Sequence, residues 1–290
     1  AGWVKNILMP RRMPVGVHAV GGDRVHLIIY IHAQTARNLV RNHNQKDTQL
    51  IKGYIFDYGG TLDTAGRHWG KVLWDTYRKC DVPVDERQFR EAYVYAERRL
   101  GSQPIIKPDF TFYNTLDAKL EIELEYLAAQ YMPDMPAKEI DTLRKNILDG
   151  IYDGVRQETA RSRKVLAEVK KDYPMALVSN FYGNISTVLR EFMLDGLFDN
   201  VIESAVVGVR KPDPQIFVLG AEALGLKPDE AVVIGDSYDK DIVPARQAGC
   251  HAVWLKGEGW NEKTYDESLP DAVITELKQV LNVKRLLRSK

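Results

Sequence analysis

Four short segments of the chain carry side chains that could handle a phosphate group. The first is an apolar, strand-prone run at residues 54–56 that ends at Asp57 and continues through Gly59, Gly60 and Thr61. A carboxylate at the end of a buried strand can act as a nucleophile or hold a metal ion. The two glycines let the backbone turn with its amides facing inward, which suits a phosphate. By itself the segment is explained equally well as a strand followed by an ordinary turn.

The other three segments repeat this arrangement later in the chain. Ser179 and Asn180 follow the apolar run at residues 175–178, and Lys211 begins a Lys-Pro-Asp-Pro stretch. Asp236 follows the apolar run at residues 231–234, and Asp241 comes five residues later. If these runs form neighbouring parallel strands, all four sets of polar groups meet in one crevice.

This combination predicts phosphoryl transfer through a carboxylate. Asp57 and Asp236 would hold Mg²⁺, which binds proteins through few carboxylates and keeps waters and a substrate phosphate as its other ligands. Asp241 would complete the metal shell or bind its waters. Ser179 and the loop amides would donate hydrogen bonds to the phosphate oxygens, and Lys211 would place a positive charge beside them.

The order of apolar runs predicts the fold that positions these groups. From residue 162 onward strands and helices alternate, which is typical of an α/β, Rossmann-like parallel sheet with helices on both faces. Residues 64–157 instead show four helical stripes separated by proline-bearing breaks. We therefore expect a core made of residues 51–63 and 158–290, interrupted by an all-helical insertion over residues 64–157.

In this order and spacing, the four segments resemble the motifs of the haloacid dehalogenase-like (HAD) hydrolase superfamily. The family's Asp-x-Asp-Gly-Thr motif is similar to residues 57–61, and its apolar strand ending in Ser or Thr is similar to residues 176–179. Its lysine resembles Lys211, and its Gly-Asp-Ser with a following Asp resembles residues 235–237 with Asp241. The resemblance spans about residues 51–285, and the helical insertion lies where one subfamily has its helical C1 cap.

The resemblance implies a function and a role for each site residue. It implies an Mg²⁺-dependent phosphatase acting on a small phosphorylated metabolite, with the cap selecting the substrate. Asp57 would be the nucleophile, and Lys211 would assist catalysis. The implied metal ligands are Asp57, the Gly59 carbonyl, Asp236 and Asp241. The implied phosphate-binding residues are Gly60, Thr61, Ser179, Asn180 and Lys211.

One position departs from the family pattern. Family phosphatases carry a second aspartate two residues after the nucleophile, and this chain has Gly59 there. That aspartate protonates the leaving oxygen and helps to activate water, and loss of such a group typically costs about 100- to 10,000-fold in rate. We therefore expect a preference for activated leaving groups, as in acyl, anhydride or aryl phosphates. His68 and Asp63 are the nearest titratable replacements, although a cap histidine and a hinge cap are the simpler roles for them.

Two alternatives to a phosphatase remain open. Some family members that cleave carbon–phosphorus or carbon–halogen bonds also lack the second aspartate, and a phosphonatase would need a cap lysine, for which Lys71 is a candidate by position. Dehalogenation fits less well because it needs no metal, whereas this chain keeps Asp236 and Asp241. The other alternative is a phosphate-binding protein that has lost turnover. Lys71 and Arg67 are otherwise expected at the solvated surface.

The composition of the chain limits the classes of binding partner that the sequence predicts. The chain has 290 residues with 40 basic and 40 acidic side chains, so its charge does not predict binding to nucleic acid or membranes. Two cysteines are too few for a disulfide framework and predict a reducing, cytoplasmic location. No apolar run approaches the ~20 residues of a membrane span. Oligomeric state and substrate identity are not predicted.

Residues 1–50 differ from the rest of the chain. They contain no Glu and four of the six histidines, and residues 1–52 carry eight basic side chains against two acidic ones. We interpret residues 1–50 as a basic extension that is either solvated and poorly ordered or not native to the mature protein, with an organelle transit segment as the third possibility. The histidines lack the spacing of helical metal ligands, so dispersed surface positions are expected.

Overall fold

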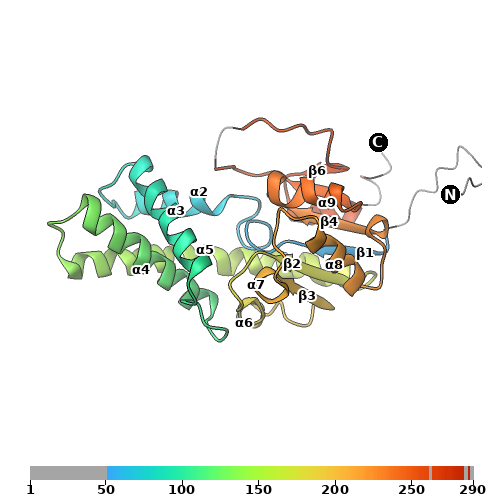
Figure 1. The fold of residues 1–290 in the computed structure, drawn as a ribbon, viewed down its shortest axis with the longest axis horizontal. Helices are drawn as coiled ribbons and strands as arrows, with labels where there is room; N and C mark the ends of the chain where they lie inside the picture. The colour runs from blue at the N-terminus through green and yellow to red at the C-terminus, as the bar shows by residue number, and fades with distance from the viewer. Residues whose placement is uncertain (1–50, 261–262, 284–286, 288–290) are drawn as a thin grey trace, which may run out of the picture. The chain divides into compact units, whose positions relative to one another are not determined.

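The computed structural model describes residues 51–260, 263–283 and 287, and the extension predicted over residues 1–50 lies outside them. A six-stranded sheet forms the centre of the described part, in the order β3-β2-β1-β4-β5-β6 (Figure 1). Every neighbouring pair is parallel, which confirms the predicted Rossmann-like α/β fold. The strands are β1 (Gly53–Phe56), β2 (Met175–Ser179), β3 (Asn200–Glu203), β4 (Ala231–Gly235), β5 (His251–Leu255) and β6 (Ala272–Ile274).

Both faces of the sheet are covered by helices. In β1, Tyr54 and Phe56 pack into one hydrophobic cluster while Ile55 packs into another, because successive side chains of a strand point to opposite faces. The first cluster includes residues of α5 (Ala137–Lys170) and α6 (Ile185–Glu191), and the second includes residues of α8 (Gln215–Ala223) and α9 (Val243–Gln247). A strand buried on both faces reads as a continuous apolar run, which is the pattern seen in the sequence.

The remaining helical segments are short. They are α7 (Ser204–Val207), the 3-10 helix η1 (Pro228–Glu230), the π-helical turn η2 (Tyr238–Ile242) and the 3-10 helix η3 (Leu277–Asn282). Among the described residues, no helix is both long enough and apolar enough to cross a membrane.

The helical insertion consists of α2 (Trp69–Lys79), α3 (Glu86–Ser102), α4 (Phe112–Tyr131) and the first half of α5. Local sequence explains where the helices start. His68 accepts a hydrogen bond from the Gly70 amide at the start of α2, and α3 and α4 begin with capping boxes made by Asp85 and Thr111. Lys119 and the other inward residues of α4 then face α3 and α5, with which α4 packs.

The last helix of the insertion differs from the sequence-based expectation. The insertion was predicted to end at residue 157, but α5 runs without a break from Ala137 to Lys170, across that boundary. Its buried face continues through Val155, Thr159 and Ser162, so polar residues bridge the gap between two apolar stripes. The Ser162 hydroxyl donates to the Leu62 carbonyl at 2.8 Å and attaches the helix to the segment after β1. The division into domains stays a prediction.

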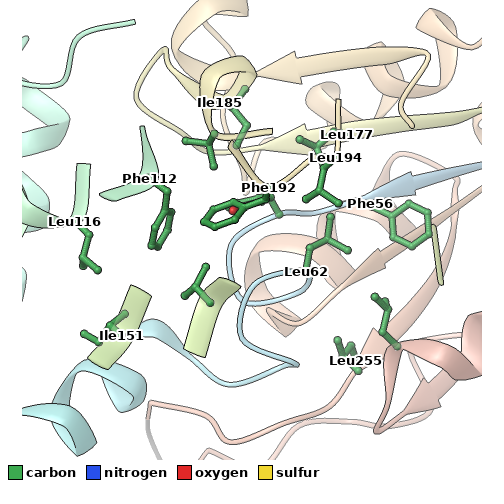
Figure 2. Packing of buried hydrophobic residues seen from close by; sticks show 14 of the residues in the cluster. Phe56, Leu62, Phe112, Leu116, Ile151, Leu177, Ile185, Phe192, Leu194 and Leu255 are labelled. Atoms are coloured by element: carbon green, nitrogen blue, oxygen red, sulfur yellow. The ribbon is translucent and has the colours of Figure 1, made fainter. Parts of the chain in front are cut away.

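The hydrophobic core does not stop at the insertion. Phe112, Leu116 and Ile151 of the insertion belong to the same cluster as Phe56 and Leu177 of the sheet, as Figure 2 shows. Close packing across this cluster fixes the insertion above the carboxyl ends of β1 and β2.

Candidate active site

Asp57, Lys211 and Asp241 meet at the carboxyl end of the sheet. The Lys211 ammonium donates to Asp57 Oδ1 at 2.5 Å and to Asp241 Oδ1 at 2.7 Å. The side chains of all three residues are at most 5% exposed. They come from the end of β1, the loop before α8 and the turn after β4, so three distant parts of the sequence converge as predicted for parallel strands.

Backbone hydrogen bonds and a glycine hold the carboxylates in place. The Thr61 hydroxyl accepts from the Asp236 amide at 3.0 Å and lies 3.3 Å from Asp57 Oδ2 and 3.1 Å from Asp236 Oδ1. The Ser237 amide donates to Asp241 Oδ2 at 3.0 Å. Gly60 has φ +100°, and a Cβ there would lie 2.4 Å from the Asp236 carboxylate. Only glycine therefore fits between the β1 turn and Asp236.

Negative charge exceeds positive charge at this end of the sheet. One carboxylate oxygen from each of Asp57, Asp236 and Asp241 lies within 4.8 Å of the others, and Lys211 supplies one ammonium group. Burial raises the pKa of Asp57 to about 6, although the nearby Lys211 ammonium acts to lower it. Burial and the two neighbouring carboxylates raise the pKa of Asp236 well above its ordinary value. Clustered carboxylate oxygens with unmatched charge are a donor set that fits a hard divalent cation.

Two predicted phosphate ligands have other partners. The Gly60 amide donates to Asp63 Oδ1 at 2.7 Å, so it is not free to bind phosphate as expected. The Asn180 side chain donates to the Lys211 carbonyl at 3.0 Å and accepts from the Lys211 amide at 2.9 Å. Asn180 therefore positions the backbone of Lys211. Ser179, 2% exposed, lines the cavity above Asp57 and keeps its predicted place.

The space above Gly59 is covered by an indole ring. A Cβ at Gly59 would lie 3.8 Å from Trp69 Nε1, which is an ordinary contact. Trp69 Nε1 donates to Asp63 Oδ2 at 3.2 Å. Asp63 is 2% exposed, and burial raises its pKa to about 8. The sequence showed Trp69 only as part of a helical stripe, because nothing local indicates that the first residue of α2 points down at the β1 turn.

A cavity of about 200 Å³ connects these groups to the helical insertion. We call its two ends the core end and the insertion end. The core end is lined by Asp57, Gly59, Ser179, Lys211, Asp236 and Asp241. The insertion end is lined mainly by aromatic and aliphatic side chains, together with Glu97, Lys119 and the core residues Tyr182 and Lys240. Sequence reasoning missed Glu97 and Lys119; a lysine inside the apolar stripe of α4 was the one available signal.

The other sequence candidates near the cavity separate into two groups. His68 and Asp63 line the cavity, but His68 Nδ1 caps α2, and burial lowers the pKa of His68 to about 4. Lys71 and Arg67 do not line it. Arg67 pairs with Asp75 and Glu258, and Lys71 Nζ lies 3.6 Å from Glu258, so the surface role expected for both fits better than a role in catalysis.

A tryptophan from the core segment after β5 enters the insertion near the cavity. The Trp260 ring lies 5.0 Å from that of Tyr93, which lines the cavity, and 4.2 Å from the Arg90 guanidinium. A Cβ at Gly70 would lie 1.5 Å from the Trp260 ring, so α2 needs a glycine at this contact. Trp260 thus fastens the insertion to the core beside the site.

Comparison with known proteins agrees with this architecture. A family model described as hydrolase, haloacid dehalogenase-like hydrolase, matches residues 51–249. A solved structure of a dehalogenase with an intermediate complex superposes with a TM-score of 0.55 at 17% identity, covering 81% of this chain and 97% of the other, which shows a shared fold.

Similar sequences include named phosphatases. A glyceraldehyde 3-phosphate phosphatase from Pyrococcus furiosus is 35% identical over 131 residues, 44% of this chain and 54% of the relative. A phosphoserine phosphatase from Thermus thermophilus is 37% identical over 89 residues, 31% of this chain and 35% of the relative. The matches thus span about half of the first relative and about a third of the second.

Proposed function

Because this chain belongs to the haloacid dehalogenase-like hydrolases, we propose that it is an Mg²⁺-dependent phosphatase that hydrolyses a small phosphorylated metabolite through an aspartyl-phosphate on Asp57. The observation that carries the proposal is the convergence of Asp57, Lys211, Asp236 and Asp241 at the floor of one cavity. The named phosphatase relatives support the same class of substrate.

The core end supplies the groups for two successive displacements at phosphorus. A carboxylate oxygen of Asp57 attacks the phosphorus, and the bond to the leaving oxygen breaks. Water then attacks the phosphorus of the aspartyl-phosphate, which releases phosphate and regenerates Asp57. Lys211, which already contacts Asp57, stabilises negative charge on the transferring group, and Ser179 donates to its oxygens.

Mg²⁺ would be held by Asp57, Asp236, Asp241 and the Gly59 carbonyl, and it would offset the repulsion between the anionic nucleophile and the anionic substrate. The unmatched carboxylate charge at the core end supports this assignment. Asp241 also accepts from the Ser237 amide and from Lys211, so it is held in place before any ligand binds.

The absence of a carboxyl group at Gly59 restricts the leaving group. Trp69 covers this position, and its N–H is already bonded to Asp63, so the indole does not replace the missing acid. An alkoxide needs a proton as it leaves, whereas aryl, acyl and anhydride oxygens leave more readily without one. We expect the enzyme to favour these activated phosphates.

Phosphonate cleavage through an imine fits less well. Imine formation needs a neutral amine. Lys71 points to Glu258, and Lys119, the insertion lysine that lines the cavity, is paired with Glu97. Burial alone would lower the pKa of Lys119, but Glu97, Tyr93, Glu123 and Tyr182 together outweigh this and hold it well above its ordinary value. Lys119 is therefore a cation at neutral pH.

A substrate screen with a matched variant tests the proposal. Wild-type protein and Asp57→Asn would be incubated with Mg²⁺ and aryl, acyl and sugar phosphates, nucleotides, phosphonates or 2-haloacids. We expect phosphate release from the activated phosphates and at least a ~1000-fold loss in Asp57→Asn, as for other catalytic nucleophiles. Equal release by the two proteins would refute the role of Asp57. Binding of phosphate without turnover would support the non-catalytic alternative.

The cytoplasmic location remains a prediction.

A further inference from the structure

Aromatic rings flank the place where the leaving group would lie. Trp69 covers Gly59 from the insertion, with its Nε1 3.8 Å from the position of a Gly59 Cβ. Phe181 comes from the core, two residues after Ser179, and also lines the cavity. Trp69 and Phe181 are only partly buried, so each ring can contact a ligand. The aromatic surface therefore begins directly beside the groups that would bind the phosphate.

The aromatic surface continues toward the insertion end. The Phe112 ring lies beside that of Trp69 with their centres 5.7 Å apart, and the Tyr182 ring lies beside that of Phe181 at 5.5 Å. All four rings line the cavity. Aromatic side chains pack favourably against a further ring in offset or edge-to-face arrangements. A wall of this kind beside a few polar groups is typical of a site for a flat apolar ligand.

The volume of the cavity limits the leaving group to about one ring. The cavity measures about 200 Å³. A cavity of roughly 150 Å³ is already large enough to hold benzene. The rest of the space is needed at the core end for the phosphate, so a two-ring leaving group would not fit.

Lys240 brings a positive charge to the opening of the cavity. It belongs to η2, directly before Asp241, and it is exposed although it lines the cavity. Burial and, second to it, the charge of Lys240 lower the pKa of His68 to about 4. His68 also lines the cavity, so the Lys240 ammonium is close enough for its charge to act on the cavity wall.

Lys240 differs from the other two lysines of the cavity in having no ion-pair partner among the described residues. Lys211 is paired with two carboxylates of the core end. Lys119 is paired with Glu97, so the charge of this carboxylate is already matched. Lys240 is thus the one lysine of the described cavity lining whose charge is unmatched.

Two other carboxylates lie near this end of the cavity, and neither neutralises Lys240. Burial raises the pKa of Asp63 to about 8, so this group is uncharged at neutral pH. Glu123 is fully buried behind Lys119, does not line the cavity, and accepts a hydrogen bond from the Tyr77 hydroxyl at 2.8 Å. Lys240 is therefore available to an anionic group that reaches the opening.

From this arrangement we propose that the substrate is the phosphate of a single aromatic ring that carries an anionic group on the side away from the phosphate. The ring lies against Trp69 and Phe181, and Lys240 binds the anionic group. This inference rests on the phosphatase function proposed above and narrows its substrate from activated phosphates in general to aryl phosphates. An aryl oxygen leaves readily without a proton, so such a substrate also fits the lack of an acid at Gly59.

Calorimetric titration of Asp57→Asn protein with Mg²⁺ present tests this recognition without turnover. Phenyl phosphate and cyclohexyl phosphate have the same number of carbons and differ in aromaticity. 4-Carboxyphenyl phosphate and 4-carbamoylphenyl phosphate have nearly the same shape and differ in charge. Inorganic phosphate probes the core end alone.

We expect phenyl phosphate to bind at least about threefold more tightly than cyclohexyl phosphate, because a flat ring packs better against aromatic side chains. The carboxylate probe should bind about fivefold more tightly than the carbamoyl probe, which is the effect of one exposed charge pair. Lys240→Met should reduce this second preference to below about twofold and leave the affinity for inorganic phosphate unchanged. Lys71→Met, which removes a lysine that does not line the cavity, should keep both preferences.

Three results would overturn the inference. The first is equal binding of the carboxylate and carbamoyl probes by Asp57→Asn protein. The second is a charge preference that survives Lys240→Met in protein with an unchanged thermal unfolding midpoint. The third is binding of phenyl phosphate no tighter than that of cyclohexyl phosphate.

The fate of the proposed hydrolysis is separate. If wild-type protein shows Asp57-dependent phosphate release but the Asp57→Asn protein lacks these binding preferences, the recognition of an aryl group fails and the hydrolysis stands. If the binding preferences are found without any Asp57-dependent release, the hydrolysis fails and the recognition site stands.

Discussion

The two ends of the cavity differ in how their charged side chains are balanced. At the core end, three carboxylates surround one ammonium group, and each is held by backbone amides or by Thr61. At the insertion end, Lys119 is matched by Glu97 and stacked on Tyr93. The core end therefore needs a cation to be balanced, whereas Lys119 and Glu97 at the insertion end already balance each other. The proposed reactive groups thus lie on the core, while this ion pair joins helices α3 and α4 of the insertion.

The largest effect is expected from restoring the missing acid at the core end. Gly59→Asp introduces a side chain whose Cβ meets only the edge of Trp69 at 3.8 Å. It should raise the turnover of alkyl phosphates such as glycerol 3-phosphate by about 100-fold or more, because a proton donor then reaches the leaving oxygen. Steady-state kinetics would show little change for para-nitrophenyl phosphate.

The neighbouring glycine provides the control for that gain. A side chain at Gly60 would meet the Asp236 carboxylate at 2.4 Å, and the residue has φ +100°. Gly60→Asp should therefore abolish activity. An unchanged ratio of alkyl to aryl turnover in Gly59→Asp would mean that leaving-group protonation does not limit this enzyme.

The imbalance of charge at the core end predicts a loss of Mg²⁺ affinity when one carboxylate is removed. Asp236→Asn should weaken Mg²⁺ binding by about 10- to 100-fold or more, measured by calorimetry. Asp239→Asn, in the same turn, is the matched control because Asp239 is exposed and pairs with Lys263. Equal losses in the two variants would argue that Mg²⁺ binds elsewhere.

Because His68 is buried at the insertion end, we expect the free energy of unfolding to depend on pH. Burial, with a smaller contribution from Lys240 and Lys119, lowers its pKa from 6.5 to about 4. As pH falls from 7 to 5 the unfolded chain gains a proton that the folded chain does not, so His68 should cost about 2 kcal/mol of unfolding free energy over this range. His68→Asn, which keeps an acceptor for the Gly70 amide, should remove that slope.

Urea denaturation at pH 7 and pH 5 measures the effect. His251→Asn changes a histidine that does not line the cavity and should leave the His68 contribution in place. Identical slopes in wild-type and His68→Asn protein would show that the histidine is not desolvated as the structure indicates.

The smallest effect is expected from changing Trp260, which joins the core to the helical insertion. Trp260→Ala removes the ring seated against Arg90, Tyr93 and Gly70. The loss of the cation–π contact, about 1 kcal/mol, should raise KM by about fivefold with a smaller change in kcat. Trp74→Ala removes a tryptophan stacked on Phe89 inside the insertion and should leave KM nearly unchanged. A large fall in kcat for Trp260→Ala would indicate that the contact also orders the core end.

Local pattern was enough to predict the sheet and the polar groups at its edge. A run such as residues 231–234 is apolar on both faces because the strand is buried on both, and the polar residue that follows it must then lie at the sheet edge. The convergence of Asp57, Lys211 and Asp236 follows from parallel strand order, which the alternation of strands and helices indicates. Each apolar run and the polar residue that ends it lie within a few positions of one another, so a local pattern suffices to find them.

Only the tertiary structure decided what surrounds those groups. The continuity of α5, the Trp69 ring over Gly59, the commitment of Asn180 to Lys211, and the pairing of Lys119 with Glu97 all join residues whose contact depends on how helices pack. Helix periodicity tells which side chains point inward, but not which neighbour they meet. The sequence therefore determined the fold class and the position of the proposed reactive groups, and packing between distant elements decided the shape and charge of the cavity above them.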